Sequence, residues 1–346
     1  MSNNLTIGEK SQQLDMFKNF IVVNNDPAIL SNIFQLWDLI PKFHVTKRQQ
    51  TKMFKDGKIE ELKYDLYLFG DKYSIEYMPA PINIDGTLKH FFPSTTEEMI
   101  EKVMRKIMLD QNMCSHKLKP TETWVQFSYK RVMKELARLG KSRSLDEVKL
   151  GINILLGCKL IIRRNGQKIN HTGIFKDNMD KGSQEYNTDL TESAIQLPQI
   201  LSSAINSREY RQSNWLLTNI LPTSLSRWFA TWLEVFFINA GIGRNGLPVA
   251  YSMKYSQIVE YSKLLGANKY DNIKRIGKAL EDLVTGKILC PMNKYIISKQ
   301  LGADGKKIID IEYKLYGSHG FAKHIIASNK RTSDLELLKL NNELKD

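Results

Sequence analysis

The sequence predicts a mixed α+β fold in which one small domain occurs twice. The stretch SYKRVMKELARLGKSRSLDEVKLGINILLGCKLII, residues 128–162, runs an amphipathic segment into Leu139-Gly140, crosses a polar turn and enters a second amphipathic segment. The stretch KYSQIVEYSKLLGANKYDNIKRIGKALEDLVTGKILC, residues 254–290, repeats this order around Leu265-Gly266. Helical spacing followed by an apolar run at the same place in both stretches indicates two copies of one domain.

Turn residues and apolar spacing predict five elements in the first copy. Thr95 and Glu98 have the form of a capping box at a helix start, and Gly140 stands where a helix commonly ends. Asn165-Gly166 between two strand-like runs is a strong hairpin signal. The expected elements are a helix over 95–107, a strand over 124–127, helices over 129–139 and 144–156, and a hairpin over 159–175.

The second copy has the same order of expected elements. They are a helix over 225–236, a strand over 249–253, helices over 258–265 and 270–284, and a longer hairpin around Asp304-Gly305. The order helix, strand, helix, turn, helix and hairpin is typical of a winged helix. The predicted fold is therefore α+β, with two tandem winged-helix domains and a small N-terminal α+β appendage.

The chain is expected to divide into four parts. Residues 1–94 form the appendage, in which residues 28–40 make an amphipathic helix; its apolar stripe packs in a core, or alternatively forms a dimer surface. The winged helices occupy residues 95–195 and 196–326, separated by the polar linker DNMDKGSQEYNTDLTES. Residues 327–346 form a C-terminal tail, too short to fold stably without a partner surface.

The net charge of +13 is unevenly distributed along the chain. Residues 1–94 hold 11 Lys+Arg against 11 Asp+Glu, residues 95–330 hold 36 against 22, and the last 16 residues hold 3 against 4. The excess therefore lies in the segment that contains the repeat. Basic segments favour polyanions, because each neutralised phosphate releases condensed counterions.

The third helix of each copy and the hairpin behind it carry the candidate DNA contacts. In a helix-turn-helix the second helix of the motif enters the major groove, where Arg can bond guanine and Asn adenine. A wing can hold phosphates, and a solvated basic face is the alternative for any single residue. The candidates are Lys141, Ser142, Arg143, Lys149, Asn153, Arg163, Arg164 and Lys168 in the first copy, and Asn268, Lys269, Lys274, Arg275, Lys278, Lys299, Lys306 and Lys307 in the second.

Patterns typical of enzymes are missing from the sequence. It has no GxxxxGK[ST] loop to cradle nucleotide phosphates, and its three cysteines form no CxxC pair. His319 and His324 are five positions apart, off the spacing of helix-borne metal ligands. We therefore expect no catalytic site, metal or cofactor. Without an apolar run near the roughly 18 residues of a membrane span, and without a signal peptide, a cytoplasmic protein is expected.

Two stretches resemble a known family. The run KRVMKELARLGKSRSLDEVKLGINILLGCKLIIRR resembles the first winged-helix domain of RepA-type plasmid replication initiators, and SLSRWFATWLEVFFIN is similar to the helix that opens their second domain. Over residues 85–325 the resemblance implies an initiator that binds repeated origin sites (iterons) as double-stranded DNA. It also implies that the chain helps to melt the adjacent duplex and recruits host replication proteins, such as a helicase or a host initiator. Members of such families often interconvert between monomer and dimer.

A transcriptional repressor with tandem winged helices and no replication role is the alternative function. It would share every DNA-binding feature named above and differ only in the process that DNA binding controls. Iterons beside the gene would favour an initiator, and promoter operators a repressor. In either case the two joined domains are expected to engage one site together, because a linker raises the local concentration of the second domain.

Overall fold

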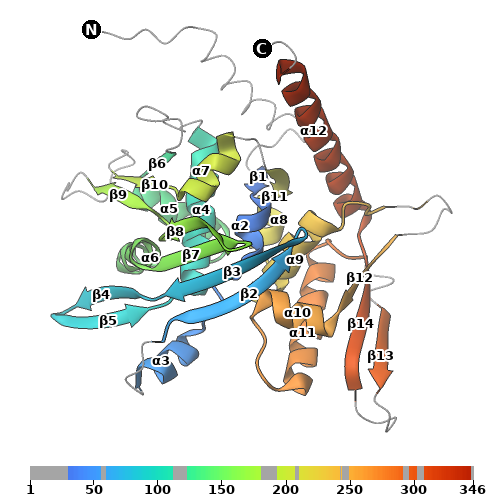
Figure 1. Ribbon diagram of the computed structural model, residues 1–346, viewed down its shortest axis with the longest axis horizontal. Coiled ribbons are helices and arrows are strands. Elements are labelled where there is room, and N and C mark those ends of the chain that lie inside the picture. Colours follow the sequence, from blue (N-terminus) through green and yellow to red (C-terminus); the bar gives the residue numbers. More distant parts are fainter. Residues whose placement is uncertain are drawn as a thin grey trace.

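The computed structural model of the chain describes residues 30–55, 60–111, 123–180, 193–206, 210–241, 243, 249–290, 296–301 and 308–343. Helices and strands are mixed along these residues, which confirms the predicted α+β class (Figure 1). Several small antiparallel sheets surround a helical centre.

The helices of the first copy form as predicted. Its elements are α4 (Thr95–Gln111), β6 (Trp124–Phe127), α5 (Tyr129–Arg138) and α6 (Leu145–Gly157). Ser144 and Glu147 form a capping box at the start of α6, which satisfies backbone N–H groups that a helix start leaves unpaired. Gly140 ends the turn after α5 at φ +66°, a conformation in which a side chain would be strained.

The two described ends of the predicted linker between the copies belong to strands. Residues 177–193 include β9 (Asp177–Asp180), which pairs with β10 (Ser193–Gln196), and β10 in turn pairs with β6. The strand order is β6-β10-β9, so β6 pairs with a strand that lies later in the chain than the predicted hairpin. The polarity of this segment favours a linker, but antiparallel pairing needs only backbone groups on an exposed strand.

The hairpin predicted after α6 forms, but in another sheet. It consists of β7 (Lys159–Arg164) and β8 (Gln167–Thr172), and both Asn165 and Gly166 at its turn have positive φ, as a tight two-residue turn requires. Strand β7 pairs with β3 (Asp71–Met78), which pairs with β2 (Leu62–Leu68). The predicted division at residue 94 stays a prediction, but this sheet takes strands from both sides of it.

Buried residues explain why β7 pairs with the N-terminal strands. In register, Leu160 lies opposite Tyr77 and Ile162 opposite Ile75, and all four side chains are buried. Cross-strand apolar pairs of this kind stabilise a sheet. The hairpin predicted over residues 159–175 therefore forms, but it pairs with β3 rather than with β6.

The second copy follows the predicted order throughout. Its elements are α9 (Ser224–Phe236), β12 (Ala250–Lys254), α10 (Tyr255–Ser262), α11 (Lys269–Thr285), β13 (Ile296–Leu301) and β14 (Ile308–Tyr316). The strand order is β12-β14-β13.

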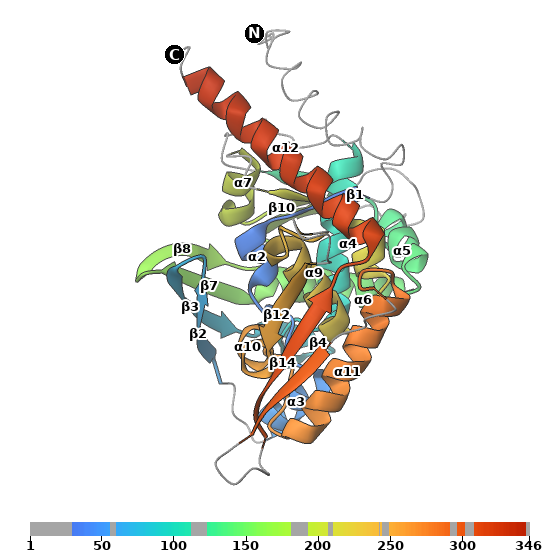
Figure 2. The ribbon, with the colours of Figure 1, turned by 90° about the vertical axis from the view of Figure 1, so that its right-hand side faces the viewer.

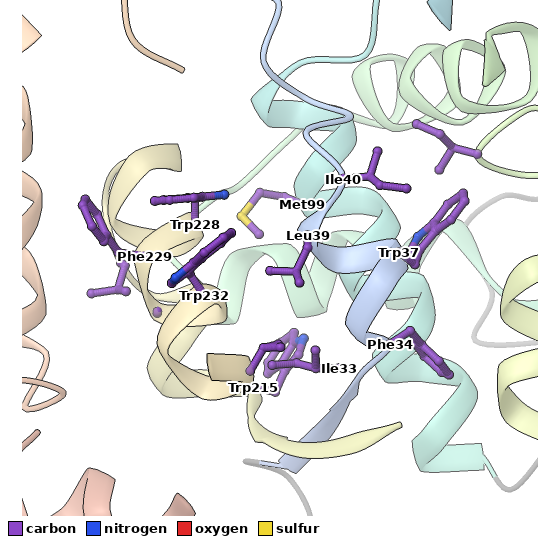
Figure 3. Close-up of a cluster of buried hydrophobic side chains, with 14 of the residues drawn as sticks. Ile33, Phe34, Trp37, Leu39, Ile40, Met99, Trp215, Trp228, Phe229 and Trp232 are labelled. Carbon is purple, nitrogen blue, oxygen red and sulfur yellow. The ribbon is translucent and has the colours of Figure 1, made fainter. Parts of the chain in front are cut away.

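The described part of the chain begins with a strand where a helix is predicted. From Leu30 the chain forms β1 (Leu30–Ile33), paired with β11 (Arg211–Asn214), and then the short helix α2 (Gln35–Leu39). Of the described apolar side chains in the predicted stripe, Ile33, Trp37 and Ile40 are nevertheless buried, in one cluster with aromatic residues of α9, and Leu36 is partly buried against it (Figure 3). The core-packing interpretation of the stripe is therefore confirmed.

The remaining elements connect these parts. Helix α3 (Lys47–Lys55) precedes β2, and the hairpin of β4 (Ala80–Ile84) and β5 (Thr87–Phe91) precedes α4. Helices α7 (Gln199–Asn206) and α8 (Trp215–Asn219) lie on either side of β11 along the chain, between the two copies.

The C-terminal residues form one long helix. Helix α12 (His319–Glu343) crosses the predicted start of the tail at residue 327 without a break, and it projects from the body of the protein (Figure 2). Its first turns are anchored, because Phe321 and Ile325 are buried. Among the described residues, no helix is both long and apolar enough to cross a membrane.

Candidate nucleic-acid interface

The two copies meet through equivalent positions of their first helices. Thr95 and Ser224, the first residues of α4 and α9, have their hydroxyl oxygens 3.2 Å apart. One turn further on, Arg227 donates from Nη2 to Glu98 at 2.7 Å and from Nε at 3.1 Å. We call this contact, made by Thr95, Glu98, Ser224 and Arg227, the seam.

Burial makes the seam a strong constraint. The Arg227 side chain is 0% exposed and that of Glu98 is 9% exposed. Burial alone would raise the pKa of Glu98, but the positive charges of Arg227 and Lys102 lower it to about 2. Buried charges are tolerated only when paired, so the seam holds the two copies in one relative orientation.

Helix α11 presents a row of cations to solvent. Lys274, Arg275 and Lys278 are exposed, whereas Ile276 and Leu280 on the opposite side are buried. The structure therefore brings together three of the residues predicted for the second copy. Their contact with DNA stays a prediction.

The two residues at the entrance to α11 act on the protein itself. The Asn268 side chain accepts hydrogen bonds from the backbone of Tyr270 and Asp271, and so caps the helix. Lys269 donates from Nζ to the carbonyl oxygens of Ile308 and Ile309 at 2.7 and 2.6 Å. These bonds fasten the start of α11 to β14.

The first copy offers fewer exposed cations. Arg143 donates to the carbonyl of Ser142 at 2.7 Å and to the hydroxyl of Thr96 at 3.3 Å. Lys141 is half-buried, and burial followed by the charges of Arg227 and Arg143 lowers its pKa. Lys149 lies over the Tyr129 ring, with Nζ 5.8 Å from the ring centre.

Two polar candidates of the first copy are exposed. Ser142 lies in the turn before α6 and Asn153 lies in the middle of that helix. Both side chains are therefore placed where a ligand could reach them.

The predicted wing residues fall in different places. Arg163 pairs with Glu76, and Arg164 donates from Nε to Asp71 at 2.7 Å, so both are held on the sheet of β2, β3, β7 and β8. Lys168 is exposed on the same sheet, and Lys299 is exposed on β13. Lys306 and Lys307 lie outside the described residues.

Helix α3 is a basic element that the sequence-based prediction does not include. Lys47, Arg48 and Lys52 are all exposed on it. The signal is present in the sequence, because residues 41–55 contain several basic residues and no Asp or Glu. A charge count over the whole 94-residue N-terminal segment hides it.

A cavity of about 260 Å³ opens beside the seam. The residue before α3, the first residues of α4 and α9, and two cations of α11 lie around it. These lining residues are Thr46, Thr95, Ser224, Arg275 and Lys278. Residues from three parts of the chain are therefore gathered near the contact between the copies.

Comparison with known proteins gives a distant structural likeness. No protein-family model matches the chain, and no curated protein matches its sequence. The chain is similar to a crystal structure of a selenomethionine derivative of domains 2 and 3 of RctB, at 11% identity over 84% of this chain and 98% of that one, with a TM-score of 0.46. A second crystal structure of RctB domains 2–3 is similar at 10% identity over 78% and 94% of the two chains, with a TM-score of 0.38. The resemblance to RepA-type initiators stays a prediction.

Proposed function

We propose that this chain is a sequence-specific double-stranded DNA-binding protein that initiates plasmid replication. It would bind repeated origin sites (iterons) and recruit host replication factors, without a catalytic site or cofactor of its own. We also propose that its two copies are tandem winged helices. This is supported by the strand orders β6-β10-β9 and β12-β14-β13, in which the strand before the second helix pairs with the last strand of the hairpin.

The seam is the observation that carries the proposal. Because Glu98 and Arg227 are buried and paired, α6 and α11 are carried on one rigid frame rather than on two domains joined by a flexible linker. Third helices that enter successive major grooves on one face of a duplex lie about one helical turn, roughly 10 base pairs, apart. A single chain would then cover about two turns of DNA.

The exposed candidate residues of the two copies have different roles in this proposal. Lys274 and Arg275 of α11 would meet base edges, where Arg is suited to guanine. Asn153 of α6 would meet a base or a phosphate in the neighbouring groove, and Lys299 of β13 would hold a phosphate. The two copies differ at these positions, so the protected site need not be a palindrome.

A footprint of the full chain on DNA that flanks its gene tests the proposal. We expect the protein to protect directly repeated sites of about two turns each. A DNA circle that carries these sites should also replicate when the protein is supplied. Protection of an inverted operator at a promoter, with no effect on replication, would instead support the tandem winged-helix repressor. An absence of protection at any flanking DNA would contradict both.

A further inference from the structure

Helix α3 carries charge of one sign only. Its sequence KRQQTKMFK contains no acidic residue, and Lys47, Arg48 and Lys52 are exposed. Arg48 and Lys52 are four positions apart, so they lie on the same face of the helix. None of the three has an ion-pair partner among the described residues. This face is therefore available to an anionic ligand.

The helix is fixed to the body of the protein rather than loosely attached. The buried Gln50 amide donates to the carbonyl oxygen of Phe92 at 2.8 Å and accepts from the Phe92 N–H at 3.0 Å. Thr46 and Gln49 form reciprocal hydrogen bonds at the helix start. Phe92 lies three residues before α4, so the orientation of α3 is tied to the helix that forms the seam.

Helix α3 also lies close to both copies. Thr46, immediately before α3, lines the cavity beside the seam with Arg275 and Lys278 of α11. On the other side, hydrogen bonds from Ser144, followed by the charges of Arg143 and Lys47, lower the pKa of Glu147 in the first turn of α6. The start of α3 is therefore near the third helix of each copy.

The turn between α10 and α11 touches the segment around α3 as well. Lys263 of that turn has its Nζ 5.7 Å from the centre of the Tyr64 ring on β2. The same ring lies edge-on to His44, with centroids 5.5 Å apart. Residues on both sides of α3 in the sequence thus lie near the turn between α10 and α11.

We infer that α3 is a third DNA-contacting element, in which Arg48 and Lys52 hold phosphates of the same duplex that α11 enters. The inference rests on the proposed function. A duplex is anionic along its whole length, so it matches cations on α3 and on α11 at once. An acidic protein partner would match α3 alone, and the experiment separates the two.

The test is the salt dependence of duplex binding by the full chain. Each phosphate contact contributes about 0.9 to the slope of log affinity against log salt. The variant Arg48→Gln/Lys52→Gln should therefore reduce the slope by about 2 and lower affinity on the order of tenfold, on preferred and random DNA alike. Glutamine keeps helix propensity, and the unfolding transition of the variant shows that it is folded.

Two further variants serve as controls. Lys159→Gln/Lys323→Gln removes the same charge from exposed positions at the starts of β7 and α12, and should leave the slope unchanged. The charge-conserving variant Arg48→Lys/Lys52→Arg should also keep the slope. A fall in slope that is equal for the α3 variant and the first control would overturn the inference, because it would reflect net charge alone.

The outcomes also separate this inference from the proposed function. One outcome is that the unaltered chain and the α3 variant both bind duplex DNA with the same slope of log affinity against log salt. In that case α3 contacts no phosphate, and an acidic protein is the ligand that its basic face would bind. If the unaltered chain itself shows no salt-dependent duplex binding, the proposed function fails first. Should the double variant not fold, Lys52→Gln alone should reduce the slope by about 1.

Discussion

Glu234 accepts a hydrogen bond from the Ser213 hydroxyl at 2.6 Å in a site that is closed to solvent. The Asn214 N–H also reaches the Glu234 carboxyl, at 3.3 Å, and His324 of α12 lies 3.6 Å away. Burial, only partly offset by these hydrogen bonds and by the charge of Arg211, raises the pKa of Glu234 to about 7.

The stability of the folded protein should therefore fall as the pH rises through the pKa of Glu234. The folded protein holds the Glu234 proton up to about pH 7, whereas an unfolded chain releases it near the ordinary pKa of 4.5. The group thus stabilises the fold fully below pH 4.5 and loses that contribution as pH rises through 7, by roughly 3 kcal/mol at most. Denaturant unfolding at about pH 5 and about pH 8 measures it. In Glu234→Gln this part of the pH dependence should vanish, and an unchanged dependence would refute the assignment.

Breaking the seam should destabilise the whole protein. Arg227→Met removes the buried cation that pairs with Glu98 and leaves only Lys102, whose Nζ lies 3.1 Å from the Glu98 carboxylate. Breaking a buried pair in this way costs about 3 to 5 kcal/mol. Arg138→Met is the matched control, because Arg138 pairs with Glu135 at 3.0 Å but is 41% exposed, and such pairs contribute at most about 1 kcal/mol. Urea unfolding of both variants compares them. Equal losses of unfolding free energy would show that the seam is not a special contact.

Truncating Arg275 should reduce sequence preference more than general affinity. Arg275→Ala is expected to weaken binding to the preferred site by about 1 to 3 kcal/mol, and binding to random DNA far less. Lys299→Ala, which removes a proposed phosphate contact, should weaken both DNAs by a similar factor. Titrations of each variant with both duplexes make the comparison. If Arg275→Ala weakens binding to the two duplexes equally, residues on another face of α11 contact the bases.

Asn268 should matter to folding rather than to base recognition. Its side chain caps α11, so Asn268→Ala should lower stability by about 1 kcal/mol. Asn153→Ala, at an exposed position inside α6, removes no cap and should leave stability nearly unchanged. Thermal unfolding measures both variants. A loss of DNA preference in Asn268→Ala without any loss of stability would contradict the capping role.

The sequence predicts what is encoded locally. Ser144 with Glu147, the left-handed Gly140 and the positive φ angles of Asn165 and Gly166 are short-range signals, and the elements that they mark form where predicted. The pairing of β7 with β3 is set instead by apolar residues far apart in the chain, such as Ile75 and Ile162. No local pattern distinguishes that partner from β6.

The candidate DNA contacts likewise divide into those set by local sequence and those set by long-range folding. The exposed face of α11 follows from its helical period, so Lys274 and Lys278 lie where the sequence places them. Lys269 and Arg143 bind carbonyl and hydroxyl groups that only folding brings near them. The spacing of residues in the sequence does not predict these contacts. The cations of α3 are visible in the sequence, and only a charge average over too long a window conceals them.

The seam also distinguishes the two copies from each other. Equivalent positions meet there, and one holds a glutamate while the other holds an arginine. Two identical first copies, brought together in this way from separate chains, would set Glu98 against a second glutamate in a buried site, and two second copies would set arginine against arginine. Like charges in that setting repel strongly. This difference between the copies thus favours contact between a first copy and a second copy, and works against contact between two first copies or two second copies of neighbouring molecules.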